Sequence, residues 1–244
     1  MGERRYELVL VGGGLANGLI AWRLAETRPD VAVTIVEQGP RLGGEHTWSF
    51  FDTDLTPEQR AWVEPIVAVS WREGYDVAFP ERRRTLSTPY NSAFSERLHE
   101  VVAARVPAER LILNAQAVSI APDRVVLADQ RVLTADAVID ARGPRAAPGL
   151  DLGFQKFLGL EVKLDRPHGL TRPIVMDATV PQIDGYRFVY VLPFSEDTML
   201  IEDTYYADGP ALPVEDLRAR VLDYAEAKGW TVERVLREET GVLP

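Results

Sequence analysis

A run of three glycines, placed between an apolar segment and a helical pattern, restricts the fold of this chain more than any other feature. Residues 7–11 are mostly apolar, the glycines occupy 12–14, and apolar residues at helical spacing follow from Leu15 to Glu26. A continuous run rich in β-branched residues then covers 31–36, as in a strand that helices cover on both faces. The first 37 residues therefore predict a strand–turn–helix–strand unit with parallel strands.

The same turn predicts a dinucleotide-binding site. Glycines let the backbone approach a pyrophosphate, and the N–H groups at the start of a helix favour an anion. Glu37 follows the second strand, where an acid accepts a hydrogen bond from a ribose hydroxyl. The predicted contacts are Gly12, Gly13, Gly14, Leu15, Ala16 and Glu37. Asn17 stands where the general pattern has a third glycine, so helix and strand must pack differently here; a glycine-rich turn without a ligand is the alternative.

A second glycine turn follows the acid at 39–44 and leads into Glu45 and His46. This spacing fits flavoproteins better than simple NAD enzymes, because the chain must return along an extended cofactor towards the isoalloxazine ring. We expect Gly43, Gly44 and His46 to contact a flavin. An ordinary loop is the alternative interpretation.

Beyond Pro148 the pattern changes from alternating helices and strands to a succession of strands separated by Pro, Gly and Asp. The predicted strands are 154–164, 174–180, 186–192, 199–205 and a last one from 230 towards 238, with a helix over 214–228. We predict an α/β protein: a Rossmann-type domain over 1–148 and an antiparallel-sheet substrate domain with one helix over 149–244.

Two of these strands predict a carboxyl group among aromatic rings. A two-residue period places Tyr186, Phe188 and Tyr190 on one face of the first strand. The same period places Glu202 on one face of the second strand, and the two faces coincide if the strands pair as a hairpin. If Leu192 lies opposite Thr198, Phe188 faces Glu202. Burial raises the pKa of a carboxyl group, so Glu202 could remain protonated near neutral pH and act as an acid.

The neighbouring Asp203 points to the opposite face of such a strand. In the alternative interpretation Glu202 is an exposed edge residue and the rings are ordinary core. A register slip of one residue would also separate the acid from the rings.

Charge and composition exclude several classes of partner. The 27 basic residues are outnumbered by 37 acidic ones, and the net charge of −10 disfavours a nucleic-acid partner. With no cysteine and only three scattered histidines, we expect no metal site. No stretch of 18 apolar residues is present, so we expect a cytoplasmic protein, with peripheral membrane contact left open.

Taken together, several segments resemble the bacterial lycopene beta-cyclase family. They are VGGGLANGL at 11–19, GGEHTWSF at 43–50, PIVMDATV at 173–180, GYRFVY at 185–190 and IEDT at 201–204. Asn17 belongs to the pattern that this family shows. The resemblance implies a fold related to the aromatic hydroxylases, with FAD held reduced by NAD(P)H and no net redox change in the substrate.

The resemblance implies an enzyme that cyclises the ends of linear lycopene to give gamma-carotene and then beta-carotene. It also implies that the essential acid of the family corresponds to Glu202. An apolar polyene substrate also implies peripheral contact with the inner face of the cytoplasmic membrane. Family members continue well past Pro244, so we expect a truncated chain with an incomplete flavin pocket and little activity. The competing interpretations are an FAD-dependent monooxygenase of an aromatic or polyene substrate and an inactive flavin-binding fragment.

Overall fold

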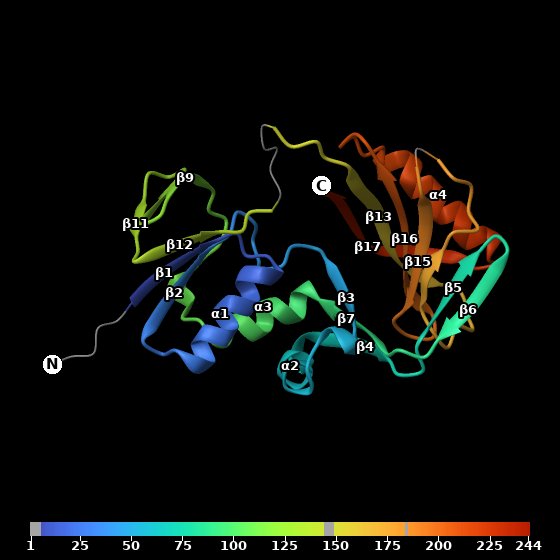
Figure 1. Ribbon diagram of the computed structural model, residues 1–244, viewed down its shortest axis with the longest axis horizontal. Helices are drawn as coiled ribbons and strands as arrows, with labels where there is room; N and C mark the ends of the chain where they lie inside the picture. Colours follow the sequence, from blue (N-terminus) through green and yellow to red (C-terminus); the bar gives the residue numbers. More distant parts are fainter. Residues whose placement is uncertain (1–5, 144–148, 184) are drawn as a thin grey trace. The chain divides into compact units, whose positions relative to one another are not determined.

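The computed structural model describes residues 6–143, 149–183 and 185–244, and the predicted opening unit is present in it (Figure 1). The chain divides into two compact units. The first contains the residues up to Trp48, Gln59–Ala68 and Ser92–Gly143. The second contains Ser49–Glu58, Val69–Asn91 and the chain beyond Gly143.

This division corrects the predicted contiguous domains 1–148 and 149–244. Residues 49–58 and 69–91 belong to the second unit, because β5 (Tyr75–Phe79) pairs in parallel with β14 (Ile174–Asp177). The predicted boundary at 148 itself lies outside the described residues. Sequence patterns report local structure, so they did not show that an early segment joins a late sheet.

The first unit is built on a parallel sheet with strand order β12-β1-β2-β8. Its elements are β1 (Tyr6–Val11), α1 (Leu15–Thr27), β2 (Val31–Val36), α3 (Ser95–Ala103), β8 (Leu111–Ile112) and β12 (Ala137–Asp140). Strand β1 is central and pairs with β2 on one side and β12 on the other. Because β1 is flanked by parallel neighbours, the glycine turn begins at the carboxyl end of the sheet, where ligands bind in doubly wound folds.

Shorter elements complete this unit and form the connections through which the chain leaves and re-enters it. A small antiparallel sheet contains β9 (Ala117–Ala121), β10 (Arg124–Leu127) and β11 (Val132–Thr134). The chain passes between the units within the strands of another sheet, β3 (Thr47–Phe51), β7 (Tyr90–Phe94) and β4 (Val67–Trp71). Helix α2 (Pro57–Val63) and three 3₁₀ turns (Asp52–Asp54, Glu64–Ile66, Ala108–Arg110) lie in the connections.

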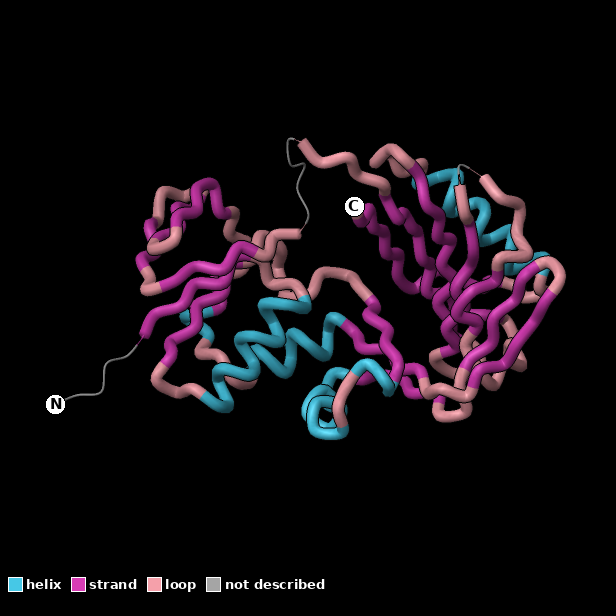
Figure 2. The backbone as a smooth tube through the Cα atoms, in the orientation of Figure 1, coloured by secondary structure: helices cyan, strands magenta, loops and turns pink. Residues whose placement is uncertain are grey.

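The second unit is dominated by a seven-stranded sheet with the order β17-β13-β16-β15-β14-β5-β6 (Figure 2). Its remaining elements are β6 (Arg82–Leu86), β13 (Phe154–Leu164), β15 (Arg187–Pro193), β16 (Thr198–Ala207), α4 (Val214–Ala227) and β17 (Val232–Leu243). All its pairings except β14 with β5 are antiparallel. The predicted α/β fold class, with one parallel and one mainly antiparallel sheet, is confirmed.

Helix α4 lies across one face of this sheet (Figure 1). It buries Leu217 and Val221 against strand residues such as Leu158, Val189 and Ile201. These strand residues point towards α4, so their neighbours in sequence point to the other face. That other face carries the predicted acid. Among the described residues, no helix combines the length and apolarity that a bilayer crossing requires.

Candidate functional site

The first two glycines of the turn are required by close contacts of the chain. Gly12 has a positive φ of 93°, and a Cβ placed on it would lie 2.5 Å from the carbonyl oxygen of Ala141. A Cβ on Gly13 would lie 2.5 Å from Cδ2 of Leu42. Both distances are shorter than real Cβ contacts: at Gly12 the contact is with backbone, so only glycine fits there, whereas at Gly13 the side chain of Leu42 would have to move.

Gly14 differs, because a Cβ there would meet open space and its φ of −69° is ordinary. It is the N-cap of α1, and no side chain caps this helix end. Nor does an acidic residue occupy the first turn. The first N–H groups of α1, which include those of Leu15 and Ala16, therefore have no side-chain cap and are available to an anionic group.

Glu37 lies directly after β2 and links the two glycine turns. One of its carboxylate oxygens accepts a hydrogen bond from N–H of Gly13 at 2.6 Å, and the other accepts from N–H of Gly39 at 2.7 Å. N–H of Gly43 donates in turn to the carbonyl oxygen of Gly13 at 2.8 Å. Each carboxylate oxygen keeps a further acceptor site, so Glu37 can also receive a hydroxyl donor.

Asn17 explains how the unit packs without the third glycine. It is completely buried, and its Nδ2 donates to the carbonyl oxygens of Val11 at 3.1 Å and Gly12 at 2.8 Å. The side chain therefore ties the first turn of α1 to the end of β1. Gly18 serves a different contact, since a Cβ there would lie 2.8 Å from Cδ2 of Leu98 in α3.

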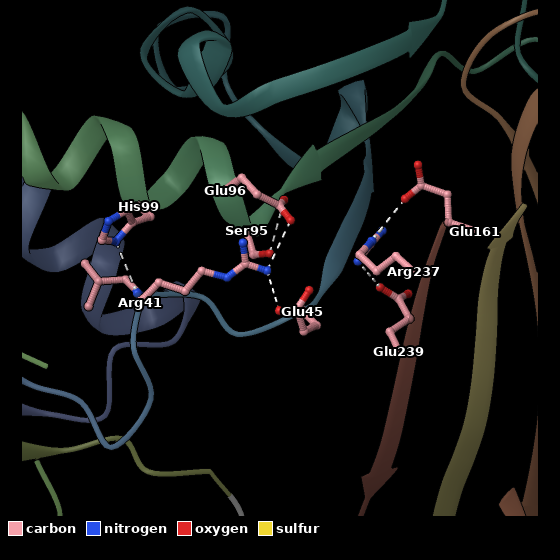
Figure 3. Close-up of polar contacts among 9 residues, drawn as sticks. Arg41, Glu45, Ser95, Glu96, His99, Glu161, Arg237 and Glu239 are labelled. Carbon is pink, nitrogen blue, oxygen red and sulfur yellow. Dashed lines mark hydrogen bonds and ion pairs between the residues drawn. The ribbon is translucent and has the colours of Figure 1, made fainter. Parts of the chain in front are cut away.

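The second glycine turn packs against the start of α3. Gly43 has a φ of 83°, and a Cβ on it would lie 2.8 Å from Cβ of Ser95. Arg41 pairs with Glu45 at 2.5 Å and with Glu96 at 3.3 Å (Figure 3). His99 accepts a hydrogen bond from N–H of Leu42 at 3.2 Å, which fits a structural role for this histidine. The turn is therefore held by specific contacts and is not a loose loop.

Gly44 and His46, the other two residues predicted to contact a flavin, are exposed. The imidazole of His46 lies 6.4 Å from the ring of Trp48, centroid to centroid. Its carbonyl oxygen accepts from N–H of Ser95 at 3.1 Å. Both residues thus follow a fixed turn while their surfaces are accessible to a ligand.

In the second unit, the predicted acid and rings share one face of the sheet, but the predicted register is wrong. Tyr190 lies opposite Glu202, and Phe188 lies opposite Thr204. Strand β15 continues to Pro193, which pairs with Met199, so the turn lies one residue later in the chain than predicted. The shift is two residues, and a shift by an even number keeps every side chain on its face.

The aromatic rings on this face are in contact with one another. The ring of Phe188 lies 5.2 Å from that of Tyr190, 5.8 Å from Tyr186 and 6.4 Å from Tyr206. The same face continues into an apolar cluster in which Leu192 and Leu200 pack with Trp71 and Tyr90. The carboxyl group of Glu202 is therefore bordered by aromatic and aliphatic side chains.

These surroundings change the acidity of Glu202. The residue keeps part of its surface accessible, but burial of its carboxyl group, with a further contribution from the charge of Glu239, raises its pKa to about 8. The hydroxyl of Thr204 donates to Oε1 of Glu202 at 2.8 Å and partly offsets this effect. Burial and the nearby charge of Glu202 also raise the pKa of Tyr190 to about 12. Glu202 can therefore hold a proton at neutral pH.

Asp203 points to the opposite face, as predicted, and is fully buried there. Its carboxylate receives Nε of Arg187 at 2.8 Å and Nη2 at 2.7 Å. This buried ion pair joins β16 to β15. Asp203 thus has a structural role, and Glu202 is the residue of the pair that can act as an acid.

Glu239 was not predicted from the sequence; it is buried on β17 and lies within hydrogen-bonding reach of Glu202. The predicted last strand stopped near 238, whereas β17 extends to Leu243. Even a correct strand boundary would not have revealed the contact, because β13 lies between β17 and β16.

A parallel unit with an uncapped helix after a glycine turn, joined to a large antiparallel sheet, is the architecture of the aromatic-hydroxylase-like oxygenases. The fold is similar to that of 2-methyl-3-hydroxypyridine-5-carboxylic acid oxygenase, with a TM-score of 0.62 and 17% identity over 99% of this chain and 72% of that one. It is also similar to a geranylgeranyl bacteriochlorophyll reductase-like protein from Thermoplasma acidophilum, with a TM-score of 0.66 and 14% identity over 99% and 66% of the two chains.

Residues 7–244 match the family described as lycopene cyclase protein, and the chain belongs to this family. It is 51% identical to a lycopene beta-cyclase of Pseudescherichia vulneris, covering 98% of this chain and 61% of the relative. It is 46% identical to a lycopene beta-cyclase of Pantoea ananas, covering 99% and 63%. The chain thus spans somewhat less than two thirds of the length of these bacterial relatives.

Proposed function

We propose that this chain carries the flavin-binding turn and the proton donor of a lycopene beta-cyclase. In the proposed reaction, acid–base chemistry closes the ends of lycopene into beta-ionone rings, giving beta-carotene through gamma-carotene, without net oxidation or reduction. The observation that carries the proposal is the position of the Glu202 carboxyl group, which lies opposite Tyr190 on an aromatic sheet face where burial raises its pKa. It occurs in a chain 51% identical to a lycopene beta-cyclase.

The residues of the first unit fit FAD as the cofactor. The N–H groups at the start of α1 would hold the pyrophosphate, Gly14 leaves room for it, and Glu37 would accept from a ribose hydroxyl. Gly12 and Gly13 form the turn that exposes these groups. Gly43, Gly44 and His46 would lie along the flavin part. When bound in its reduced form, with NAD(P)H as reductant, FAD supplies negative charge that stabilises a cation.

Glu202 is proposed as the general acid. Its proton passes to a terminal double bond of the substrate and leaves a tertiary carbocation, which the neighbouring double bond attacks to form the ring. Loss of a proton from the ring then gives the product, so the substrate gains one proton and loses one, and its composition is unchanged. The ring of Tyr190, which lies opposite Glu202, would stabilise a cation at this site through its electron-rich face, with Phe188 packed beside it.

The substrate also implies contact with a membrane surface. Lycopene is a hydrocarbon, so an enzyme that acts on it must take it from an apolar phase. We propose peripheral contact with the inner face of the cytoplasmic membrane.

Pigment analysis in cells that accumulate lycopene tests this function. The chain, and a version extended at its C-terminus to the length of its relatives, should be expressed with and without Glu202→Gln. We expect beta-carotene and gamma-carotene, which have the same mass as lycopene, from the extended chain and none from its Glu202→Gln variant. Oxygen-dependent NADPH consumption with an oxygenated product would instead establish a monooxygenase. A yellow, flavin-containing extended chain that makes no cyclic product would establish a binding role alone.

A further inference from the structure

Gly159 on β13 lies between two glutamates of the neighbouring strands. It pairs with Glu202 of β16 on one side and with Glu239 of β17 on the other. A Cβ on Gly159 would lie 3.1 Å from Cγ of Glu239 and 3.4 Å from Cβ of Glu202. Because glycine has no side chain, the two acidic side chains meet above the strand that separates them.

These two carboxyl groups lie within reach of a hydrogen bond to each other. Two carboxylates cannot form such a bond without a proton, so at least one of the pair is protonated. Glu239 is only 4% exposed, which makes a second negative charge in this place unfavourable. The pair therefore shares one proton, as two adjacent buried acids do.

The neighbours of each acid determine which one keeps that proton. Nη1 of Arg237 lies 2.8 Å from Oε2 of Glu239, and this guanidinium stabilises the ionised form of Glu239. Glu202 has the neutral hydroxyl of Thr204 as a neighbour instead. A cation next to one acid and a neutral group next to the other place the negative charge on Glu239 and the proton on Glu202.

Arg237 is itself held in place. Its Nε donates to Oε2 of Glu161 at 3.0 Å, and Glu161 lies opposite Arg237 on the neighbouring strand β13 (Figure 3). The guanidinium thus bridges two carboxylates on one sheet face. This arrangement leaves Glu239 ionised and fixed towards Glu202.

The other titratable groups near the pair do not change this assignment. Tyr190 and Tyr90 lie on the same side and are neutral at pH 7, because burial raises the pKa of both hydroxyl groups. Asp203 lies on the opposite face and is neutralised by Arg187. Its charge adds a smaller contribution in the same direction as that of Glu239.

We propose that Glu239, fixed by Arg237, is a positioning residue that keeps the catalytic proton on Glu202 between turnovers. The proposal rests on the proposed function for the role of Glu202. When Glu202 gives its proton to the substrate, two carboxylates face each other. Their repulsion favours the return of a proton from the ring-closed cation to Glu202, so the pair ends each cycle with the proton it began with.

Infrared spectroscopy of the purified chain tests the pair directly, without substrate or cofactor. The protonated carboxyl of Glu202 should give a C=O band at pH 7 that Glu202→Gln removes. In Glu239→Gln the repulsive charge is lost, so the titration midpoint of this band should fall by about one pH unit or more. In Arg237→Gln the midpoint should rise, because the cation that favours the doubly ionised pair is gone.

The matched control is Glu238→Gln. Glu238 neighbours Glu239 on β17 but pairs with Arg218 of α4 at 2.7 Å, so this change should leave the midpoint where it is. Opposite shifts in the two test variants cannot come from general loosening of the fold. If Glu239→Gln does not fold, the upward shift in Arg237→Gln alone decides the question.

Unchanged midpoints in the test variants would overturn the proposal, and so would a band that persists in Glu202→Gln. A normal titration pattern in a chain that cyclises no lycopene, even when extended, would instead contradict only the proposed function.

Discussion

The amide of Asn17 donates a hydrogen bond to the carbonyl oxygen of Gly12 at 2.8 Å, and this contact replaces the packing that a third glycine provides in the general dinucleotide-binding turn. The carbonyl oxygen of Val11 receives a second bond from the same amide. The turn therefore depends on the side chain of Asn17, at a position where the general pattern has a glycine.

We expect Asn17→Ala to lower the free energy of unfolding by about 1–3 kcal/mol, because it removes both hydrogen bonds of a buried side chain. Urea unfolding followed by circular dichroism measures the change. Thr27→Ala is the control, since its hydroxyl bonds Arg23 at the exposed end of the same helix. Equal losses of stability in the two variants would show that the hydrogen bonds of Asn17 contribute no more than an exposed one.

Gly12→Ala and Gly14→Ala should separate stability from cofactor binding. At Gly12 the positive φ and the 2.5 Å approach to Ala141 predict a loss of about 2 kcal/mol or more of folding free energy. At Gly14 the open space predicts a normally stable chain. If Gly14 faces the pyrophosphate, its variant should still bind FAD about tenfold or more weakly in a fluorescence titration. Unchanged affinity would remove Gly14 from the site.

Glu202→Gln should abolish cyclisation and leave FAD binding intact, because the amide keeps the size of the side chain but has no acidic proton. We expect loss of at least about a hundredfold in rate, the lower range for removal of a general acid. Product analysis from the extended chain measures it, with flavin absorbance as the check on folding. Normal ring formation would remove Glu202 from the mechanism.

The pH dependence of stability reports the same group independently. The pKa of Glu202 is raised from 4.5 to about 8 on folding, so its protonated form favours the folded state at low pH. This stabilisation is fully present below about pH 4.5 and is lost as the pH rises through about 8. Thermal unfolding of Glu202→Gln, compared with the unchanged chain, should show a stability difference that grows in favour of the variant from pH 5 to pH 9. Parallel curves would contradict the raised pKa.

Asp203→Asn should fail in a different way from Glu202→Gln. It leaves the buried guanidinium of Arg187 without its anion, which costs about 3–5 kcal/mol of folding free energy. Denaturant unfolding measures this loss. The exposed Asp208→Asn serves as the control and should change stability by less than about 0.5 kcal/mol. A stable Asp203 variant that loses only its activity would show that Asp203, and not Glu202, takes part in the chemistry.

The sequence alone determined the local features of this protein. The glycine turn, the start of its helix and the position of Glu37 depend on residues close together in the chain, whose conformational preferences act locally. The alternation along 198–207 similarly put Glu202 and Asp203 on opposite faces, because side chains of a strand alternate whatever it pairs with.

Only the tertiary structure decided which strands are neighbours. It moved Tyr190 opposite Glu202, brought 69–91 into the second unit, and placed Gly159 between Glu202 and Glu239. These relationships join segments far apart in the chain, and they depend on strand order and register, which are set by packing of the whole sheet. No periodicity within one strand contains that information, so the carboxyl pair became visible only in the folded protein.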